Sequence, residues 1–367
     1  MKILFVYGHE PSGHASAAHA LEFCARAQGL EAVCANISDY HSVLGPAIAK
    51  TYLQLIQKWP GLWTALYDNQ LVAGVARNWQ KLYIGFQGGK LESKLKEIRP
   101  DLVVCTHAPP LAALALEKAK GGFDWPLVAV ITDFRVHSYW IAPRADLYLA
   151  ATSEESEFLE GKGIPLARVR DTGIPIHPVF EQPLEKTAAR KSLGLSGESP
   201  VILITGGSRG LGQLAVMAQT LLKKLKSSHI LIVCGSNQEL YEELNARACA
   251  GGRLLVFGRL PPDKIKQLMC ASDLLIGKAG GLTSSEALAV GLPMIFFKPI
   301  PGQEIRNAEF LLERGAAVQA RSLDELTGLV AGLLESKNIE AMSRKAKALG
   351  RPDSARRALE AMLAICQ

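Results

Sequence analysis

Short apolar runs rich in β-branched residues recur along the chain, and segments with helical periodicity separate them. Runs that are apolar throughout and alternate with helices are typical of parallel sheets covered on both faces. The runs form two groups, at residues 3–7, 32–35, 102–106, 127–132 and 147–150, then at residues 201–205, 229–234, 253–257, 274–276 and 294–297. The pattern predicts two α/β domains.

A connection rich in Pro, Gly and Ser separates the two groups at residues 174–200 and contains one short basic helical stretch. We therefore expect a first domain at residues 1–175, a linker at 176–200 and a second domain at 201–350. A basic helix is predicted at residues 351–367. The pattern leaves open whether this helix closes the second domain or packs back on the first.

The composition, with 367 residues of which 48% are hydrophobic and 21% charged, is that of a globular chain of about two domains and excludes disorder. The seven cysteines form no C-x-x-C pair, which favours a reducing compartment. No apolar stretch approaches the length of a membrane span, and the N-terminal one is too short for a signal peptide. We expect a cytosolic protein.

Three glycine turns follow predicted strands, at residues 7–18 (YGHEPSGHASAA), 205–212 (TGGSRGLG) and 278–288 (KAGGLTSSEAL). In α/β domains, ligands bind at such turns because glycine lets the backbone approach and helix N-termini favour anions. The three turns together indicate a ligand that carries phosphate.

The second turn also matches the cofactor loop of short-chain dehydrogenases. Such an enzyme needs a Tyr-x-x-x-Lys pair, which this chain lacks, and about 200 residues precede the loop. The chain also contains no Asp-x-Asp motif, through which many nucleotide-sugar enzymes hold a metal ion. The inventory fits a glycosyl transfer without metal or cofactor, in which helix N-termini, backbone N–H groups and basic side chains neutralise the leaving diphosphate.

The first turn, the stretch at residues 52–79, the linker sequence TGIPI at 172–176, the third turn and the segment KPIPGQEIRN at 298–307 together resemble a known family. They are similar to the diacylglycerol glycosyltransferases, meaning monogalactosyldiacylglycerol synthases and bacterial processive diacylglycerol glucosyltransferases. A more distant similarity is to the N-acetylglucosaminyltransferase of peptidoglycan lipid synthesis. The resemblance implies the glycosyltransferase B fold, in which two Rossmann-like domains face each other across a cleft, and an inverting reaction.

The resemblance implies that the second domain binds a UDP-sugar. The second turn would lie near the diphosphate, residues 256–260 near the uracil, and the third turn would donate backbone N–H groups to phosphate. Glu286 would accept the ribose hydroxyls. The implied donor-binding residues are Gly206, Gly207, Ser208, Phe257, Gly258, Arg259, Lys278, Ala279, Gly280, Gly281, Leu282, Thr283, Glu286, Gln303, Glu304 and Asn307.

His14, in the first turn, is the candidate catalytic residue. An inverting transfer needs a base for the acceptor hydroxyl, or a group that orients it, and the reference pKa of histidine, about 6.5, suits either role. The family often has Asp and several glycines before this histidine, whereas this chain has residues EPSG, so the identity of an assisting acid stays open. The candidates on the acceptor side are Gly13, Glu10, His107, Asp133 and His137.

A lipid acceptor requires the enzyme to lie on a bilayer, and residues 42–99 supply a candidate element. This segment carries +5 of the net charge of +6 and three of the five tryptophans. Aromatic and basic side chains at helical spacing are typical of a helix in an anionic interface. The predicted membrane-binding residues are Trp59, Trp63, Trp79 and Lys81.

The sequence thus favours a peripheral enzyme on the cytoplasmic face of the membrane that moves glucose or galactose from a UDP-sugar to diacylglycerol. No nucleic-acid-binding motif accompanies the basic charge. Three alternatives stay open: transfer to another lipid such as the undecaprenyl-linked peptidoglycan precursor, a UDP-sugar epimerase of the same fold, and a nucleotide-sugar-binding regulator. The choice between the sugars, the number of sugars added and the oligomeric state are also open.

Overall fold

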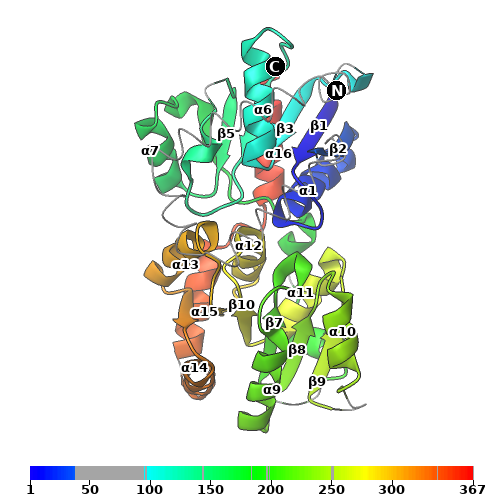
Figure 1. The fold of residues 1–367 in the computed structure, drawn as a ribbon, viewed down its shortest axis with the longest axis vertical. Helices are drawn as coiled ribbons and strands as arrows, with labels where there is room; N and C mark the ends of the chain where they lie inside the picture. The colour runs from blue at the N-terminus through cyan, green and yellow to red at the C-terminus, as the bar shows by residue number, and fades with distance from the viewer. Residues whose placement is uncertain are drawn as a thin grey trace.

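The computed structural model describes residues 1–37, 95, 97–142, 144–182, 184–195, 197, 199–248, 252–336 and 338–366. Within these ranges the chain forms two α/β halves, one above the other in Figure 1. The predicted membrane-binding residues Trp59, Trp63, Trp79 and Lys81 lie outside the described residues.

Among the described residues, each half contains a six-stranded sheet in which every pairing is parallel. The first sheet has the order β2-β1-β3-β4-β5-β6 and the second β12-β11-β10-β7-β8-β9. The strands of the first are β1 (Lys2–Tyr7), β2 (Glu31–Asn36), β3 (Leu102–Cys105), β4 (Leu127–Val130), β5 (Leu147–Ala150) and β6 (Val169–Asp171). Those of the second are β7 (Val201–Thr205), β8 (His229–Val233), β9 (Leu254–Phe257), β10 (Leu274–Gly277), β11 (Met294–Phe297) and β12 (Ala317–Ala320).

The ten apolar runs of the sequence all become strands, with ends shifted by at most two residues. The two strands that the sequence analysis missed, β6 and β12, lie at sheet edges. Each has only three or four residues and is partly exposed, so neither carries a continuous apolar run. The predicted α/β class, with two parallel sheets, is confirmed.

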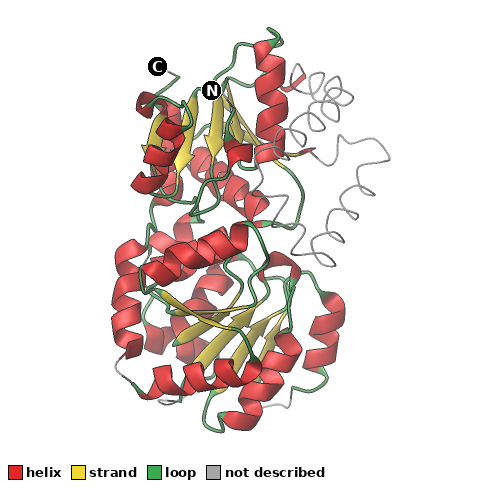
Figure 2. Cartoon of the chain, turned by 60° about the vertical axis from the view of Figure 1, so that its left-hand side comes forward, coloured by secondary structure: helices red, strands yellow, loops and turns green. Residues whose placement is uncertain are grey.

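Helices cover both faces of each sheet, as Figure 2 shows. Their bounds are α1 (Gly13–Ala27), α6 (Ala108–Ala119), α7 (Ser153–Gly161), α8 (Lys186–Ser192), α9 (Leu214–Lys224), α10 (Gln238–Asn245), α11 (Pro262–Ala271), α12 (Gly281–Ala289), α13 (Gln303–Glu313), α14 (Leu323–Glu335), α15 (Asn338–Leu349) and α16 (Ser354–Leu363). Each sheet therefore has two apolar cores, one on each face. None of the described helices is long and apolar enough to cross a membrane.

The last helix, α16, belongs to the first half in space although it ends the chain. Ala355, Ala358, Leu359 and Met362 are buried against α1 and the strands of the first sheet, and Figure 1 shows red α16 among the N-terminal elements. Burying side chains of the size of Leu359 and Met362 stabilises the fold by about 1.5–3 kcal/mol each. The chain therefore crosses between its halves twice.

The two crossings run side by side. The backbone N–H of Ile176 donates to Ser354 Oγ over 3.2 Å, and Arg357 Nη2 donates to the carbonyl oxygen of Asp171 over 3.0 Å. A Cβ added at Gly173, whose φ is +84°, would lie 2.9 Å from Cβ of Arg351. Glycine is therefore required here both for the backbone conformation and for the close approach of the second crossing.

Candidate active site

The turn after β1 carries His14 into the first turn of α1. Ser12 is the N-cap, because its Oγ accepts a hydrogen bond from the backbone N–H of Ala15 over 3.1 Å. The same hydroxyl donates to the carbonyl oxygen of His9 over 2.6 Å. The local sequence thus ends the turn and begins the helix, which places His14 at the carboxyl edge of the first sheet.

The imidazole of His14 is held by the ends of two other strands. Its Nδ1 lies 3.0 Å from the carbonyl oxygen of Thr106 and 2.7 Å from Oγ1 of Thr132. A carbonyl oxygen only accepts hydrogen bonds, so Nδ1 carries the proton and Nε2 carries the lone pair. Burial, followed by the neighbouring His9, lowers the pKa of His14 to about 4, against the opposing effect of the Thr106 bond. At neutral pH the ring is uncharged, with Nε2 ready to accept a proton.

Further histidines surround His14. The ring of His107 stacks on it, with centroids 4.2 Å apart, and His9 meets His107 edge-on. Burial lowers the pKa of His9 to about 4 and that of His107 well below its usual value. A Cβ added at Gly8 would lie 2.0 Å from Nδ1 of His107, so this glycine allows the ring to reach His14.

Asp133 and His137 follow β4 and are both buried. Burial raises the pKa of Asp133 to about 6 and lowers that of His137 to about 3. Oδ1 of Asp133 accepts a hydrogen bond from Nδ2 of Asn307 over 3.2 Å, and Oδ1 of Asn307 accepts one from the backbone N–H of Phe134 over 2.8 Å. Asn307, which the resemblance implies as a donor-binding residue, here joins α13 to the segment after β4 in the first half.

The second glycine turn follows β7 and has a shape that only glycine permits. Gly207 and Gly210 have φ values of +72° and +59°, and a Cβ at Gly210 would lie 2.0 Å from the carbonyl oxygen of Cys234. Ser208 is exposed at the tip of this turn. The side chain of Arg209 extends from the turn to the other half of the molecule, where its Nε donates to the carbonyl oxygen of Pro11 over 3.2 Å.

The third turn brings the start of α12 against the His14 region. Gly280 is the N-cap residue and offers no side-chain cap, and the first turn holds no acidic residue. A Cβ at Gly281 would lie 2.1 Å from the carbonyl oxygen of Thr132, and one at Gly13 would lie 3.5 Å from Cβ of Leu282. The N–H groups and positive end of this helix therefore lie beside the residue that holds the His14 ring, where an anion binds favourably.

The other candidate residues of the second half flank this helix. Burial raises the pKa of Glu286 to about 8, and this carboxyl lies in the second turn of α12. The Glu304 carboxylate accepts a hydrogen bond from the backbone N–H of Ile300 over 2.7 Å and lies 3.4 Å from Nζ of Lys278. Phe257 ends β9, and Arg259, two residues later, reaches Oε1 of Glu10 over 2.8 Å. Gln303 begins α13.

Comparisons with known proteins assign the family. A monogalactosyldiacylglycerol synthase model matches residues 14–176, and a glycosyltransferase family 28 C-terminal domain model matches residues 201–358. Processive diacylglycerol beta-glucosyltransferases of Bacillus mycoides (strain KBAB4) and Bacillus cereus (strain B4264) are 30% identical over 372 residues, covering 99% of this chain and 93% of each relative. The chain belongs to the diacylglycerol glycosyltransferase family. The resemblance drawn from the sequence is confirmed, and the protein is a glycosyltransferase.

Solved structures share the architecture of this glycosyltransferase. MurG of Acinetobacter baumannii has a TM-score of 0.61 at 18% identity and covers 99% of both chains. UDP-GlcNAc 2-epimerase from Neisseria meningitidis has a TM-score of 0.59 at 16% identity, covering 99% of this chain and 100% of its own. HepE of Anabaena, in complex with UDP, has a TM-score of 0.57 at 16% identity with the same coverage. At these identities the likeness concerns the fold, and the predicted glycosyltransferase B architecture is confirmed.

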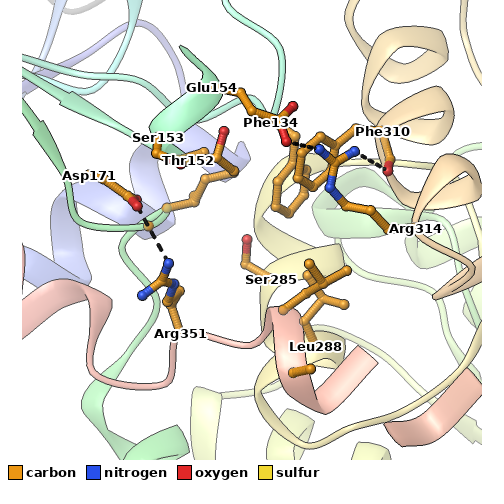
Figure 3. A pocket seen from close by; sticks show the side chains of 15 residues that line it. Phe134, Thr152, Ser153, Glu154, Asp171, Ser285, Leu288, Phe310, Arg314 and Arg351 are labelled. Carbon is orange, nitrogen blue, oxygen red and sulfur yellow. Dashed lines mark hydrogen bonds and ion pairs between the residues drawn. The ribbon is translucent and has the colours of Figure 1, made fainter. Parts of the chain in front are cut away.

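A cavity of about 180 Å³ lies between the halves of the glycosyltransferase, beside the two chain crossings, and is lined by Phe134 and by residues of α7, α12 and α13. None of the described candidate residues lines it. Figure 3 shows Arg314 facing Glu154 and Arg351 facing Asp171 at its walls, with Phe134 beside Phe310. The two phenyl rings stack with centroids 5.0 Å apart. This region joins the halves near the crossings.

One group of described side chains has metal-ligand chemistry, namely His19, Glu22 and Cys34. Glu22 already pairs with Arg26 over 2.6 Å, so its charge is matched within the protein. The group lies on α1 and β2, and includes none of the candidate active-site residues.

Thr106 and Thr132, which hold His14, and Arg209, which joins the second turn to the first, were not predicted from the sequence. Neither was His9, whose ring packs edge-on against His107. Thr106 and Thr132 stand directly after or near the ends of β3 and β4, where strand-end position alone was a usable signal. Arg209 stands inside the second glycine turn. Its contact with Pro11 is 198 residues away in sequence and has no local signature.

Proposed function

We propose that this glycosyltransferase moves a hexose from a UDP-sugar to diacylglycerol, with inversion and without a metal ion. The observation that carries the proposal is the meeting of a proton-accepting imidazole and a helix N-terminus without a side-chain cap. Thr132 contacts both, since its Oγ1 lies 2.7 Å from Nδ1 of His14 and its carbonyl oxygen abuts Gly281. The names of the relatives supply the acceptor and favour glucose as the sugar.

In this mechanism Nε2 of His14 takes the proton of the acceptor hydroxyl while that oxygen attacks C1 of the sugar. The bond from the acceptor oxygen to C1 forms as the bond from C1 to the phosphate oxygen breaks, and the electron pair leaves with UDP. One displacement inverts the anomeric centre. The N–H groups at Gly281 and the following residues stabilise the departing diphosphate.

The remaining candidates hold the donor. Gly206, Gly207 and Ser208 approach the diphosphate from the second turn, and Glu286 receives the ribose hydroxyls. An α-helical carboxyl one turn after a phosphate-binding N-terminus is placed for a cis-diol. Hydrogen bonds from the diol favour the ionised carboxylate, so donor binding should lower the raised pKa of Glu286.

A metal ion is not required by this arrangement. The carboxylates of Glu10 and Glu304 each face a cation of the protein, Arg259 and Lys278 respectively. The positive end of α12 and nearby basic side chains supply the charge that a metal ion provides in other transferases.

We place the enzyme on the cytoplasmic face of an anionic bilayer, where the acceptor hydroxyl lies. The proposed membrane contacts are Trp59, Trp63, Trp79 and Lys81, because residues 42–99 are basic and rich in tryptophan. Substituting Trp59, Trp63 and Lys81 together by Ala should abolish flotation of the protein with anionic liposomes. Failure of the wild type to float would contradict the peripheral placement.

The deciding experiment incubates labelled UDP-glucose or UDP-galactose with liposomes that contain diacylglycerol, with and without EDTA. We expect glucose to enter the lipid phase at an EDTA-independent rate, as the β-anomer in the NMR spectrum of the product. Label in neither lipid fraction overturns the proposal. Conversion of the UDP-sugar itself without acceptor would instead indicate an epimerase, and transfer to undecaprenyl-linked lipid a different acceptor.

A further inference from the structure

Arg209 projects from the second glycine turn onto the loop that precedes His14. It ends a short helical turn at residues 207–209 that Gly210 closes in the left-handed conformation, with φ +59°. Its Nε–H donates to the carbonyl oxygen of Pro11, and its positive charge is the second cause, after burial, of the low pKa of His9. The guanidinium therefore lies between the second glycine turn and the first.

The cations at this edge differ in what they face. Lys278 faces the carboxylate of Glu304 at 3.4 Å, and Arg259 faces that of Glu10 at 2.8 Å. The hydrogen bond found for Arg209 within the described ranges goes to a neutral carbonyl oxygen and uses Nε alone. Its charge is not matched by a carboxylate there, and Nη1 and Nη2 are left to bind an external anion.

The diphosphate of a UDP-sugar needs such a cation. A helix N-terminus contributes about half a positive charge, whereas the leaving diphosphate carries a larger negative charge. A guanidinium binds two phosphate oxygens through parallel N–H groups, which a helix end cannot supply with the same geometry. We propose that Nη1 and Nη2 of Arg209 bind the donor diphosphate while its Nε holds Pro11. This proposal rests on the proposed function for the identity of the donor.

The contact with Pro11 links donor binding to the catalytic base. Pro11 is followed by the N-cap Ser12 and then by the first turn of α1, which contains His14. An arginine that holds phosphate and Pro11 together aligns the leaving group with the base. Arg209 is thus a donor-binding residue that also positions His14.

The test compares the affinity for UDP with that for uridine by titration calorimetry on the full chain. Arg209→Met should weaken UDP binding about 10–100-fold, in line with the loss of a charged hydrogen bond, and leave uridine binding within about twofold. Arg209→Lys keeps the positive charge but loses the paired N–H donors of the guanidinium. It should therefore recover part of the UDP affinity but not kcat at saturating donor. Arg321→Met, which removes an exposed arginine of the same half, is the matched control and should bind UDP as the wild type does.

Two results would overturn the proposal: UDP binding by Arg209→Met within about twofold of the wild type, or equal weakening of UDP and uridine. Recovery of both affinity and kcat in Arg209→Lys would remove the link to Pro11. If the wild type binds UDP but transfers no sugar to diacylglycerol, the proposed function fails, while the binding comparison still decides the role of Arg209. A wild type that binds no UDP overturns both.

Discussion

The two halves of this glycosyltransferase meet in two regions that are built from different chemistry. At the candidate active site the contacts are made by glycine backbone, neutral imidazoles and threonines, as where Gly281 meets Thr132, beside an ion pair between Arg259 and Glu10. Beside the chain crossings they are made by ion pairs and stacked phenyl rings around a cavity. The first region leaves N–H groups, a lone pair and charge available to a ligand, whereas the second uses its charges within the protein.

The largest effect is expected from removing the imidazole of His14, the catalytic base of the first region. His14→Ala should lower kcat by about 10²–10⁴-fold, because proton transfer from the acceptor hydroxyl loses its positioned acceptor. UDP affinity should stay near that of the wild type, since His14 acts on the acceptor. The measurement is transfer to diacylglycerol liposomes beside calorimetric titration with UDP.

His19→Ala is the control for this experiment, because His19 lies on the same helix and is exposed in part. It should retain transfer. Full turnover by His14→Ala would remove His14 from the mechanism and leave the two regions without a functional difference.

Protonation of His14 should lower the activity about tenfold for each pH unit below the pKa of this base. The unprotonated form of His14 is the active one, so kcat/KM, which reports the enzyme without substrate, should stay level from pH 8 to 6 and fall as the pH drops toward the folded pKa of about 4. The lowered pKa also means that the unfolded state binds more protons, so stability should be lost as the pH falls below about 6.5. A fall in kcat/KM centred near pH 6.5, with the fold intact, would contradict the burial of His14.

Gly281→Ala should destabilise the first region by a steric clash. The added Cβ would lie 2.1 Å from the carbonyl oxygen of Thr132, and such overpacking costs about 1–3 kcal/mol of folding free energy. Thermal unfolding measures it, and the expected shift is a fall in Tm. Gly280→Ala is the matched control for stability, because nothing lies within 4 Å of its Cβ position and its φ is −73°. Equal Tm values for the two variants would refute the close approach.

Glu154→Gln should have the smallest effect, in the second region. The Glu154 side chain is 49% exposed, and such ion pairs contribute about 0–1 kcal/mol. Denaturant unfolding and kcat should both stay close to the wild type. A large loss of kcat would indicate that the crossing region takes part in catalysis and would abolish the contrast between the two regions.

Much of the site could be located from the sequence because its turns are local. Strand, glycine turn and helix follow one another along the chain. The sequence alone therefore predicts that Gly206, Gly281 and His14 lie at a sheet edge. What holds them could not be located in this way. Nδ1 of His14 meets Thr106 and Thr132 across separations of 92 and 118 residues. Asn307 could be assigned to the second half, but not to Asp133 and Phe134 of the first.

The sequence by itself determined the two parallel sheets, the turns at their edges and the family, because each depends on short-range pattern or on motifs that lie within one segment. The tertiary structure decided which edges face each other, the tautomer of His14 and the position of α16 on the first half. These depend on contacts between segments that are far apart in the chain. Burial and hydrogen-bond partners, which set the protonation of a histidine, exist only after those segments have packed.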